Sequence, residues 1–325
     1  MSKSYFLGID TSNYTTSLAV IDANGQISAD SRQLLPVEAG EKGLRQSEAL
    51  FWHIKNLPDV VQRLTMQVPD LHSHLRAIAV TTSPRPVLDS YMPVFLAGTS
   101  FAEGLASILQ VPCFSLSHQE NHLWAGLFTA GRPKLNEFLA LHLSGGTTEL
   151  LHVRMTGDYH LQVAIIGGSM DLHAGQFIDR VGVAIGLPFP AGPHLERLAS
   201  SSQQDLVIPS YHREGQISFA GQETAALRLL QQHNKADVAR AVLMNIARTI
   251  AKMIRWAAQK TGITKVVLVG GVCANQLIRA ELTARLDQLQ LYFADPRFSV
   301  DNALGAAIFA GLSYGQTAFY SHVFP

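Results

Sequence analysis

Apolar and polar residues follow two different periods along this chain, and the two periods alternate. Short apolar runs bounded by turn residues predict strands, whereas apolar residues spaced three and four apart predict helices. The predicted strands are residues 5–9, 18–21, a segment around 27, 75–80, 111–116, 138–143, 149–153, 161–166, 265–269 and 291–293. The predicted helices are 48–67, 92–109, a helix from 118, 170–185, 223–231, 236–260, 276–286 and one from 301. Strands that alternate with helices indicate an α/β layer architecture.

The chain is organised around residues 138–153, where two apolar runs flank the segment Ser-Gly-Gly-Thr-Thr at 144–148. This pattern predicts a β-hairpin. Two glycines let a backbone approach an anion closely, and the hydroxyl and N–H groups around them are donors, so the turn has the size and chemistry to bind phosphate. Gly-Gly is also a preferred loop of ordinary hairpins. The turn by itself leaves both interpretations open.

A second hairpin of the same design occurs near the start of the chain. Residues 5–9 and 18–21 flank a polar segment, 10–16, in which Asp10 ends the first strand. Repetition of the unit strand, polar turn, strand about one domain apart indicates an internal duplication. A later pair, Gly270 and Gly271, joins a strand to a helix, where it permits either a planar base against the backbone or close strand–helix packing.

Two histidines lie four residues apart in the segment that starts at Ser117. On a helix, His118 and His122 face the same side, so both imidazoles can bind one metal ion. The alternative is a helix start with Ser117 as its cap and two incidental histidines. Asp301 is the best carboxylate to complete the set, and its alternative role is the N-cap of the last helix.

Two further groups of charged residues have an open interpretation. Asp171 and Asp179 are expected two turns apart on nearly the same face of one helix. They are candidate ligands, and the alternative is that they form a solvated helical face. Arg248, Lys252 and Arg255 project together from the longest predicted helix. They are candidates for contact with RNA phosphates, and the alternative is a solvated stripe.

Composition narrows the class of protein. A length of 325 residues favours two domains. Lysine plus arginine and aspartate plus glutamate both total 25, so no global charge field indicates nucleic acid, and any such contact is local. Two cysteines in apolar segments, Cys113 and Cys273, argue against a disulfide framework. No apolar run approaches bilayer length and the first residues carry no long h-region, so we expect a cytoplasmic protein without membrane contact.

Two hairpin-plus-helix units with phosphate-type turns, and a Gly-Gly turn before a late helix, are the parts of the duplicated ribonuclease H-like ATPase fold of actin and sugar kinases. We therefore predict an α/β protein with two lobes around a nucleotide cleft. The expected domains are 1–116 plus 301–325, and 117–300.

Seven ordered motifs make the resemblance more specific. They are Gly-Ile-Asp-Thr-Ser at 8–12, Ser-His-xxx-His at 117–122, Leu-Ser-Gly-Gly at 143–146, Ala-Gly-xxx-Asp at 174–179, Gly-Pro at 192–193, Gly-Gly-Val-x-Ala-Asn at 270–275 and Asp-Asn at 301–302. Their order resembles the tRNA N6-adenosine threonylcarbamoyltransferase family, once labelled O-sialoglycoprotein endopeptidases. The similarity covers nearly the whole chain.

The resemblance implies an acyltransferase that moves threonylcarbamoyl from its adenylate to N6 of the adenosine after the anticodon of tRNA. It implies one iron or zinc ion on His118, His122 and Asp301, and family-type protein partners or a homo-oligomer. It implies an adenylate pocket lined by Ser144, Gly145, Gly146, Thr147, Asp179, Gly192 and Asn275. His53 matches a histidine of an early family helix. No residue is singled out as catalytic.

This chain departs from the family pattern at four positions. Tyr14 and Thr15 replace an acidic pair, Thr147 replaces a histidine, and Gln176 replaces a glutamate. These changes leave the acceptor open. Two alternatives therefore stand beside the tRNA enzyme, namely a carbamoyl-type transferase for another acceptor and a non-catalytic nucleotide-binding scaffold for an active homologue.

Overall fold

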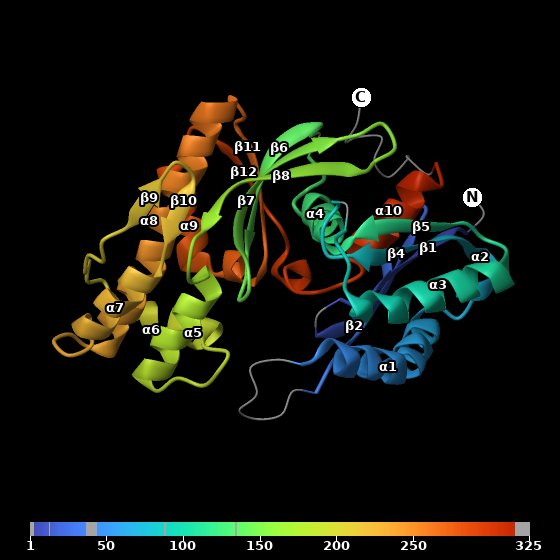
Figure 1. The fold of residues 1–325 in the computed structure, drawn as a ribbon, viewed down its shortest axis with the longest axis horizontal. Coiled ribbons are helices and arrows are strands. Elements are labelled where there is room, and N and C mark those ends of the chain that lie inside the picture. The colour runs from blue at the N-terminus through green and yellow to red at the C-terminus, as the bar shows by residue number, and fades with distance from the viewer. Residues whose placement is uncertain (1–2, 13, 37–43, 88, 134, 316–325) are drawn as a thin grey trace. The chain divides into compact units, whose positions relative to one another are not determined.

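The computed structural model describes residues 3–12, 14–36, 44–87, 89–133 and 135–315 (Figure 1). The chain divides into two compact units. The first is residues 1–136, 155–162 and 300–325, and the second is 137–154 and 163–299. These units place residues 117–136 with the first unit, and the predicted domain limits stay a prediction. The last ten residues of the predicted first domain lie outside the described ranges.

The first unit is built on a five-stranded sheet in the order β3-β2-β1-β4-β5. Its strands are β1 (Tyr5–Asp10), β2 (Thr15–Asp22), β3 (Ile27–Leu34), β4 (Leu75–Ser83) and β5 (Cys113–Ser117). Its helical segments are α1 (Gln46–Gln67), α2 (Leu71–His74), η1 (Pro93–Phe95), α3 (Leu96–Leu109), α4 (His118–Thr129) and α10 (Leu304–Ser313). The middle strands are buried because helices cover both faces of the sheet, and Pro58 does not end α1.

A glycine in β1 brings the last helix onto this sheet. A Cβ atom at Gly8 would lie 2.2 Å from the carbonyl oxygen of Ala303 and 2.3 Å from the nitrogen of Ala307. Only glycine allows the start of α10 to approach the strand this closely. This packing fixes the segment that carries Asp301 beside the end of β1.

The second unit contains a seven-stranded sheet in the order β12-β11-β6-β7-β8-β10-β9. Its strands are β6 (Glu137–Leu143), β7 (Thr148–Met155), β8 (Leu161–Ser169), β9 (Tyr211–Arg213), β10 (Gln216–Ser218), β11 (Lys265–Val269) and β12 (Gln290–Phe293). Its helical segments are α5 (Ala174–Ile185), α6 (Gly192–Ala199), α7 (Ala220–Leu229), α8 (Lys235–Thr261), η2 (Gly271–Ala274), α9 (Gln276–Arg285) and η3 (Pro296–Phe298). Its core packs the buried side chains of α8 and α5 together with those of the sheet.

The two sheets share one plan. Strands β8-β7-β6-β11-β12 repeat the order β3-β2-β1-β4-β5, with an antiparallel hairpin at the centre and two parallel strands on the far side. Strands β10 and β9 extend only the second sheet. The internal duplication predicted from the hairpins is confirmed. The central hairpin is also confirmed, since β6 and β7 pair with Leu143 opposite Thr148.

Two helix starts differ from the prediction. Helix α5 begins at Ala174, so Asp171 lies before it and the predicted shared helical face of Asp171 and Asp179 is wrong. Asp171 instead accepts hydrogen bonds from Ser218 Oγ (2.7 Å) and the N–H of Phe219 (2.9 Å), which hold it in a loop.

In the part of the chain that the structure describes, no helix is both long and apolar enough to cross a bilayer.

Helix α10 begins at Leu304, not at residue 301. Its first turn is satisfied by the side chain of Asn302, which accepts a hydrogen bond of 2.9 Å from the N–H of Leu304. The interpretation of Asp301 as the N-cap is therefore wrong, and its carboxylate is available for another contact.

Candidate metal centre and nucleotide loop

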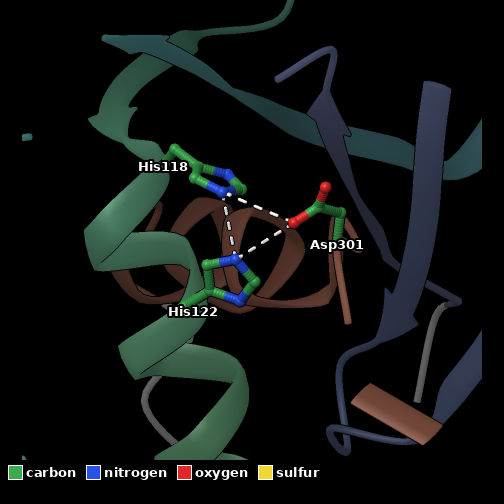
Figure 2. A group of neighbouring side chains, drawn as sticks. All are labelled: His118, His122 and Asp301. Carbon is green, nitrogen blue, oxygen red and sulfur yellow. Dashed lines mark hydrogen bonds and ion pairs between the residues drawn. The ribbon is translucent and has the colours of Figure 1, made fainter. Parts of the chain in front are cut away.

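The first unit brings His118, His122 and Asp301 together (Figure 2). The two imidazole Nε2 atoms lie 3.0 Å apart, and Asp301 Oδ1 lies 3.6 Å and 3.4 Å from them. Ligands about 2.1 Å from a tetrahedral ion lie about 3.4 Å from one another, so these separations fit one ion. Two imidazoles and a carboxylate are donors that suit iron or zinc.

The helix that carries the histidines has a complete N-terminal cap. Ser117 Oγ accepts from the N–H of Glu120 (3.2 Å), and the Glu120 carboxylate accepts from the N–H of Ser117 (2.8 Å). Ser117 therefore caps the helix, as the alternative interpretation predicted, and the two histidines still lie together. The capping box fixes the first turn of α4, and with it the direction of His118.

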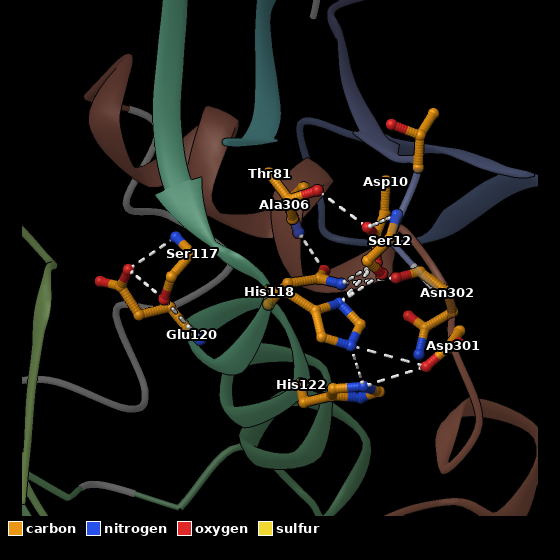
Figure 3. A network of polar contacts seen from close by, with 12 residues as sticks. Asp10, Ser12, Thr81, Ser117, His118, Glu120, His122, Asp301, Asn302 and Ala306 are labelled. Carbon is orange, nitrogen blue, oxygen red and sulfur yellow. Dashed lines mark hydrogen bonds and ion pairs between the residues drawn. The ribbon is translucent and has the colours of Figure 1, made fainter. Parts of the chain in front are cut away.

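Asp10 orients His118 through the ring nitrogen that does not face His122 and Asp301 (Figure 3). The Nδ1 atom of His118 lies 2.9 Å from Asp10 Oδ2 and 2.7 Å from Ser12 Oγ. A bond at Nδ1 fixes the ring so that Nε2 faces His122 and Asp301. Metal-binding histidines commonly make this second bond to a carboxylate.

Asp10 is fully buried and is held by several donors. The N–H of Ser12 and the hydroxyl of Thr81 reach its Oδ1 atom at 2.9 Å and 2.8 Å. Burial alone raises the pKa of the Asp10 carboxyl, but the charge and hydrogen bond of His118, with the bonds from Ser12, outweigh burial and lower the pKa to about 2. Burial by itself lowers the pKa of His118, but the charge and hydrogen bond of Asp10, with the charge of Asp301, outweigh burial and raise the pKa above its usual value.

Asn121 connects the two segments that carry the ligands. Its amide nitrogen donates to Asp10 Oδ2 (3.1 Å), and its Oδ1 atom accepts from the N–H of Ala306 (2.8 Å). A Cβ atom at Gly305 would lie 1.9 Å from the Asn121 carbonyl oxygen, so α4 and α10 are in direct backbone contact. Sequence reasoning missed the roles of Asp10 and Asn121. The available signals were an acid that ends the first strand and an amide between two histidines.

In the second unit, the Ser-Gly-Gly turn rests on the start of α5. Ser144 donates its N–H to the Thr147 carbonyl (2.8 Å), and Gly175 donates its own to the Ser144 carbonyl (3.2 Å). A Cβ atom at Gly175 would lie 2.6 Å from Gly145 Cα. Gly145 and Gly146 are exposed, with open space where a Cβ atom would point. The start of α5 thus supports the turn, and the backbone at Gly145 and Gly146 is accessible to solvent.

The Gly-Gly turn after β11 packs against the same hairpin. Gly270 has φ +99°, and a Cβ atom there would lie 2.4 Å from the Leu143 carbonyl oxygen. Close packing is therefore one use of this glycine. Buried Asn275 ends the turn and caps α9 by accepting from the N–H of Ile278 (2.9 Å).

Asp179, on α5, lies beside the residue that precedes Gly192 at the start of α6. Asp179 Oδ1 accepts a hydrogen bond of 2.7 Å from the N–H of Ala191, the residue before Gly192. Burial raises the pKa of Asp179, and the Ala191 bond lowers it by less. The seven predicted nucleotide residues thus belong to one unit and occupy the hairpin turn, the α5–α6 junction and the α9 cap.

The three basic residues of α8 do not act as one group. Lys252 Nζ donates to Ser210 Oγ (2.6 Å), and Arg255 Nη2 donates to the Arg285 carbonyl (2.7 Å). Arg248 is partly buried. Lys252 and Arg255 are thus directed to different neighbours, which divides the predicted common stripe.

Comparisons with known proteins agree with this geometry. The family model of tRNA N6-adenosine threonylcarbamoyltransferase (TsaD) matches residues 41–308. Among solved structures, component A of the (R)-2-hydroxyglutaryl-CoA dehydratase of Acidaminococcus fermentans is 19% identical over 96% of this chain and 99% of its own, with a TM-score of 0.59. The ROK hexokinase of Thermus thermophilus is 16% identical over 96% and 99%, with a TM-score of 0.55. HypF of T. kodakarensis is 15% identical over 100% of this chain and 49% of its own, with a TM-score of 0.60. These likenesses confirm the duplicated actin-like α/β fold.

Proposed function

Because the chain belongs to the tRNA N6-adenosine threonylcarbamoyltransferase family, we propose that it transfers threonylcarbamoyl from threonylcarbamoyl-adenylate to N6 of the adenosine that follows the anticodon of tRNA. In this reaction the amine nitrogen attacks the carbamoyl carbon. The bond from that carbon to the phosphate oxygen breaks, AMP leaves with the electron pair, and the amine loses a proton. We expect the protein to act in the cytoplasm with protein partners or as a homo-oligomer.

The observation that carries the proposal is the arrangement around His118. Its Nε2 atom lies close to Nε2 of His122 and to Oδ1 of Asp301. Its Nδ1 atom is hydrogen-bonded to the buried carboxylate of Asp10. We assign one iron or zinc ion to this set. When bound, the ion would supply a Lewis acid that polarises the carbamoyl oxygen. Asp10 keeps His118 in the tautomer that presents Nε2.

The second unit supports the assignment of the adenylate. The exposed N–H groups of the turn at Gly145 and Gly146, and the N-terminus of α5 beneath it, would donate to phosphate oxygens. Donors held in place before the reaction stabilise the negative charge that develops on the leaving AMP. Ser144 and Thr147 would add hydroxyl donors, while Asp179, Gly192 and Asn275 would shape the pocket.

The metal assignment is tested by elemental analysis of the purified protein beside His118→Ala. We expect about one iron or zinc per chain in the wild type and a large loss in the variant. His233→Ala is the matched control, because His233 is exposed and lies in the other unit. Equal metal content in the wild type and His118→Ala would remove the metal from the proposal.

The activity is tested by supplying threonylcarbamoyl-adenylate with tRNA and measuring threonylcarbamoyladenosine in the digested nucleosides. Product that disappears in His118→Ala and persists in His233→Ala supports the proposal. A protein that holds its metal and its adenine nucleotide but yields no product would instead transfer to another acceptor. That outcome has a specific basis, because Gln176 is neutral where the family has a glutamate; it caps α5 by accepting from the N–H of His173 (3.1 Å).

A further inference from the structure

The second unit contains a pocket of about 530 Å³ between its edge hairpin and α7. Its lining includes Met170, Pro209, Tyr211, Ser218, Gly221 and Gln222. None of the seven predicted nucleotide residues lines it. A volume of this size lies within the usual range for small-molecule sites.

Gln222 places an unused amide in the pocket. The residue is 4% exposed, and its side-chain amide makes no hydrogen bond to any residue that the structure describes. Neither amide atom is among the fully buried polar atoms that lack a partner, so the amide is open to the pocket, where a ligand can bond it. One donor and one acceptor side by side match the N6 and N7 edge of adenine.

The walls of the pocket suit a flat ring. Tyr211, on edge strand β9, is 43% exposed and lies directly opposite Ser218 on β10. Met170 and Pro209 add apolar surface beside it. Aromatic side chains of this exposure provide stacking platforms for unpaired bases.

The charge at the rim is suited to phosphate. Lys252 donates to Ser210 Oγ (2.6 Å), a residue of the pocket lining, and its ammonium group is exposed. Asp171, an acid that contacts the lining residue Ser218, is already engaged by Ser218 Oγ (2.7 Å) and the N–H of Phe219 (2.9 Å). Lys252 is one of the three basic residues that the sequence marked as candidates for RNA contact.

We propose that this pocket binds an unpaired adenine base of an RNA, with the base stacked on Tyr211, its N6 and N7 edge on the Gln222 amide, and a flanking phosphate on Lys252. The inference rests on the proposed function in naming RNA as the macromolecule. It adds a contact with RNA outside the residues assigned to the metal and the adenylate.

The test is fluorescence anisotropy of a labelled ten-nucleotide oligo(A) RNA and an oligo(C) RNA of the same length, with the full-length chain. Gly221→Leu fills the pocket, since Gly221 is an exposed helical residue with open space at its Cβ position. Gln222→Leu removes the amide. The matched control is Gly104→Leu in α3, another exposed helical glycine with open space. Circular dichroism checks that all variants fold.

We expect the wild type to prefer oligo(A), and the two pocket variants to bind it on the order of tenfold more weakly, as for the loss of a bidentate or stacking contact. Gly104→Leu should bind as the wild type does. The proposal is overturned if the pocket variants keep full affinity, if the wild type has no preference for oligo(A), or if the wild type binds neither RNA. It is also overturned if Gly221→Leu alters only the oligomeric state in sedimentation, because the pocket is then a protein interface.

The same proteins separate this inference from the proposed function. A wild type that modifies tRNA while both pocket variants bind RNA normally contradicts the pocket alone. A wild type that binds oligo(A) through the pocket but forms no threonylcarbamoyladenosine contradicts the proposed reaction alone.

Discussion

The side-chain amide of Asn121 donates a hydrogen bond of 2.5 Å to the backbone carbonyl of Asn302. Asn121 lies between the two histidines on α4, and Asn302 follows Asp301. One amide thus fixes the distance between the helix that supplies two candidate ligands and the loop that supplies the third.

Asn121→Ala should weaken metal binding. The substitution frees the Asp301 loop and leaves the N–H of Ala306 without its acceptor, so we expect metal affinity to fall about 10- to 100-fold, as for other residues that orient ligands. The free energy of unfolding should fall by about 1–3 kcal/mol. Competition with a chromophoric chelator measures the affinity, and Asn24→Ala, at an exposed turn of the same unit, is the control. An unchanged affinity in Asn121→Ala would contradict this role.

Asp10→Asn tests the carboxylate behind His118. The amide keeps the shape of the side chain but removes the charge that favours a proton on Nδ1 of His118. We expect metal affinity to fall about 10- to 100-fold with little change in the circular dichroism spectrum. Asp70→Asn is the control, because Asp70 pairs with Lys3 at the surface of the same unit. Equal losses in both variants would mean that the effect is not local.

Gly175→Ala tests the contact between α5 and the hairpin turn. The added Cβ atom would lie 2.6 Å from Gly145 Cα and 2.7 Å from the Ser144 carbonyl oxygen, both backbone atoms that must move. We expect a loss of about 1–3 kcal/mol in the free energy of unfolding, measured in urea, and weaker binding of adenine nucleotide. Gly221→Ala in α7 meets no neighbour and should be neutral or stabilising. Stability equal to wild type in Gly175→Ala would show that the turn can move freely.

The pH dependence of stability should include Asp171. Burial raises the pKa of its carboxyl, but the bonds from Ser218 and from the N–H groups of Phe219 and Leu172 lower it overall. A pKa that is lower in the folded state gives stability that is present above the unfolded pKa, about 3.9, and is lost as pH falls through the folded pKa. Urea unfolding of wild type and Asp171→Asn should therefore differ most near pH 7 and converge in acid. A constant difference across this range would contradict the linkage.

The sequence by itself determined the local elements and the candidate ligands that lie within one element. A helical period places His118 and His122 on one face whatever the tertiary structure, because residues four apart are neighbours on any helix. The hairpin at 138–153 follows equally from two apolar runs around a glycine turn, and β6 pairs with β7 as that pattern predicts. The repeat of this hairpin near the N-terminus, together with the Gly-Gly turn before a late helix, predicted the duplicated fold.

Helix starts depended on competition between local propensity and distant partners. Apolar spacing favoured a helix that includes Asp171, but Ser218 and the N–H of Phe219 hold this carboxylate in a loop, and these partners lie 47 and 48 residues further along the chain. The spacing of apolar residues contains no information about either partner, because both come close to Asp171 only through the pairing of β10 with β8.

Only the tertiary structure decided which groups surround the metal candidates. Asp10 is 108 residues from His118, and Asn121 is 185 residues from Ala306, yet each pair is within hydrogen-bond distance. Gly8 and Gly305 permit this by letting α10 pack against both β1 and α4. The sequence could name His118 and His122 as candidate ligands because they lie one turn apart on one helix. It could not name the residues that orient them, because backbone packing between segments far apart in the chain brings those residues into contact.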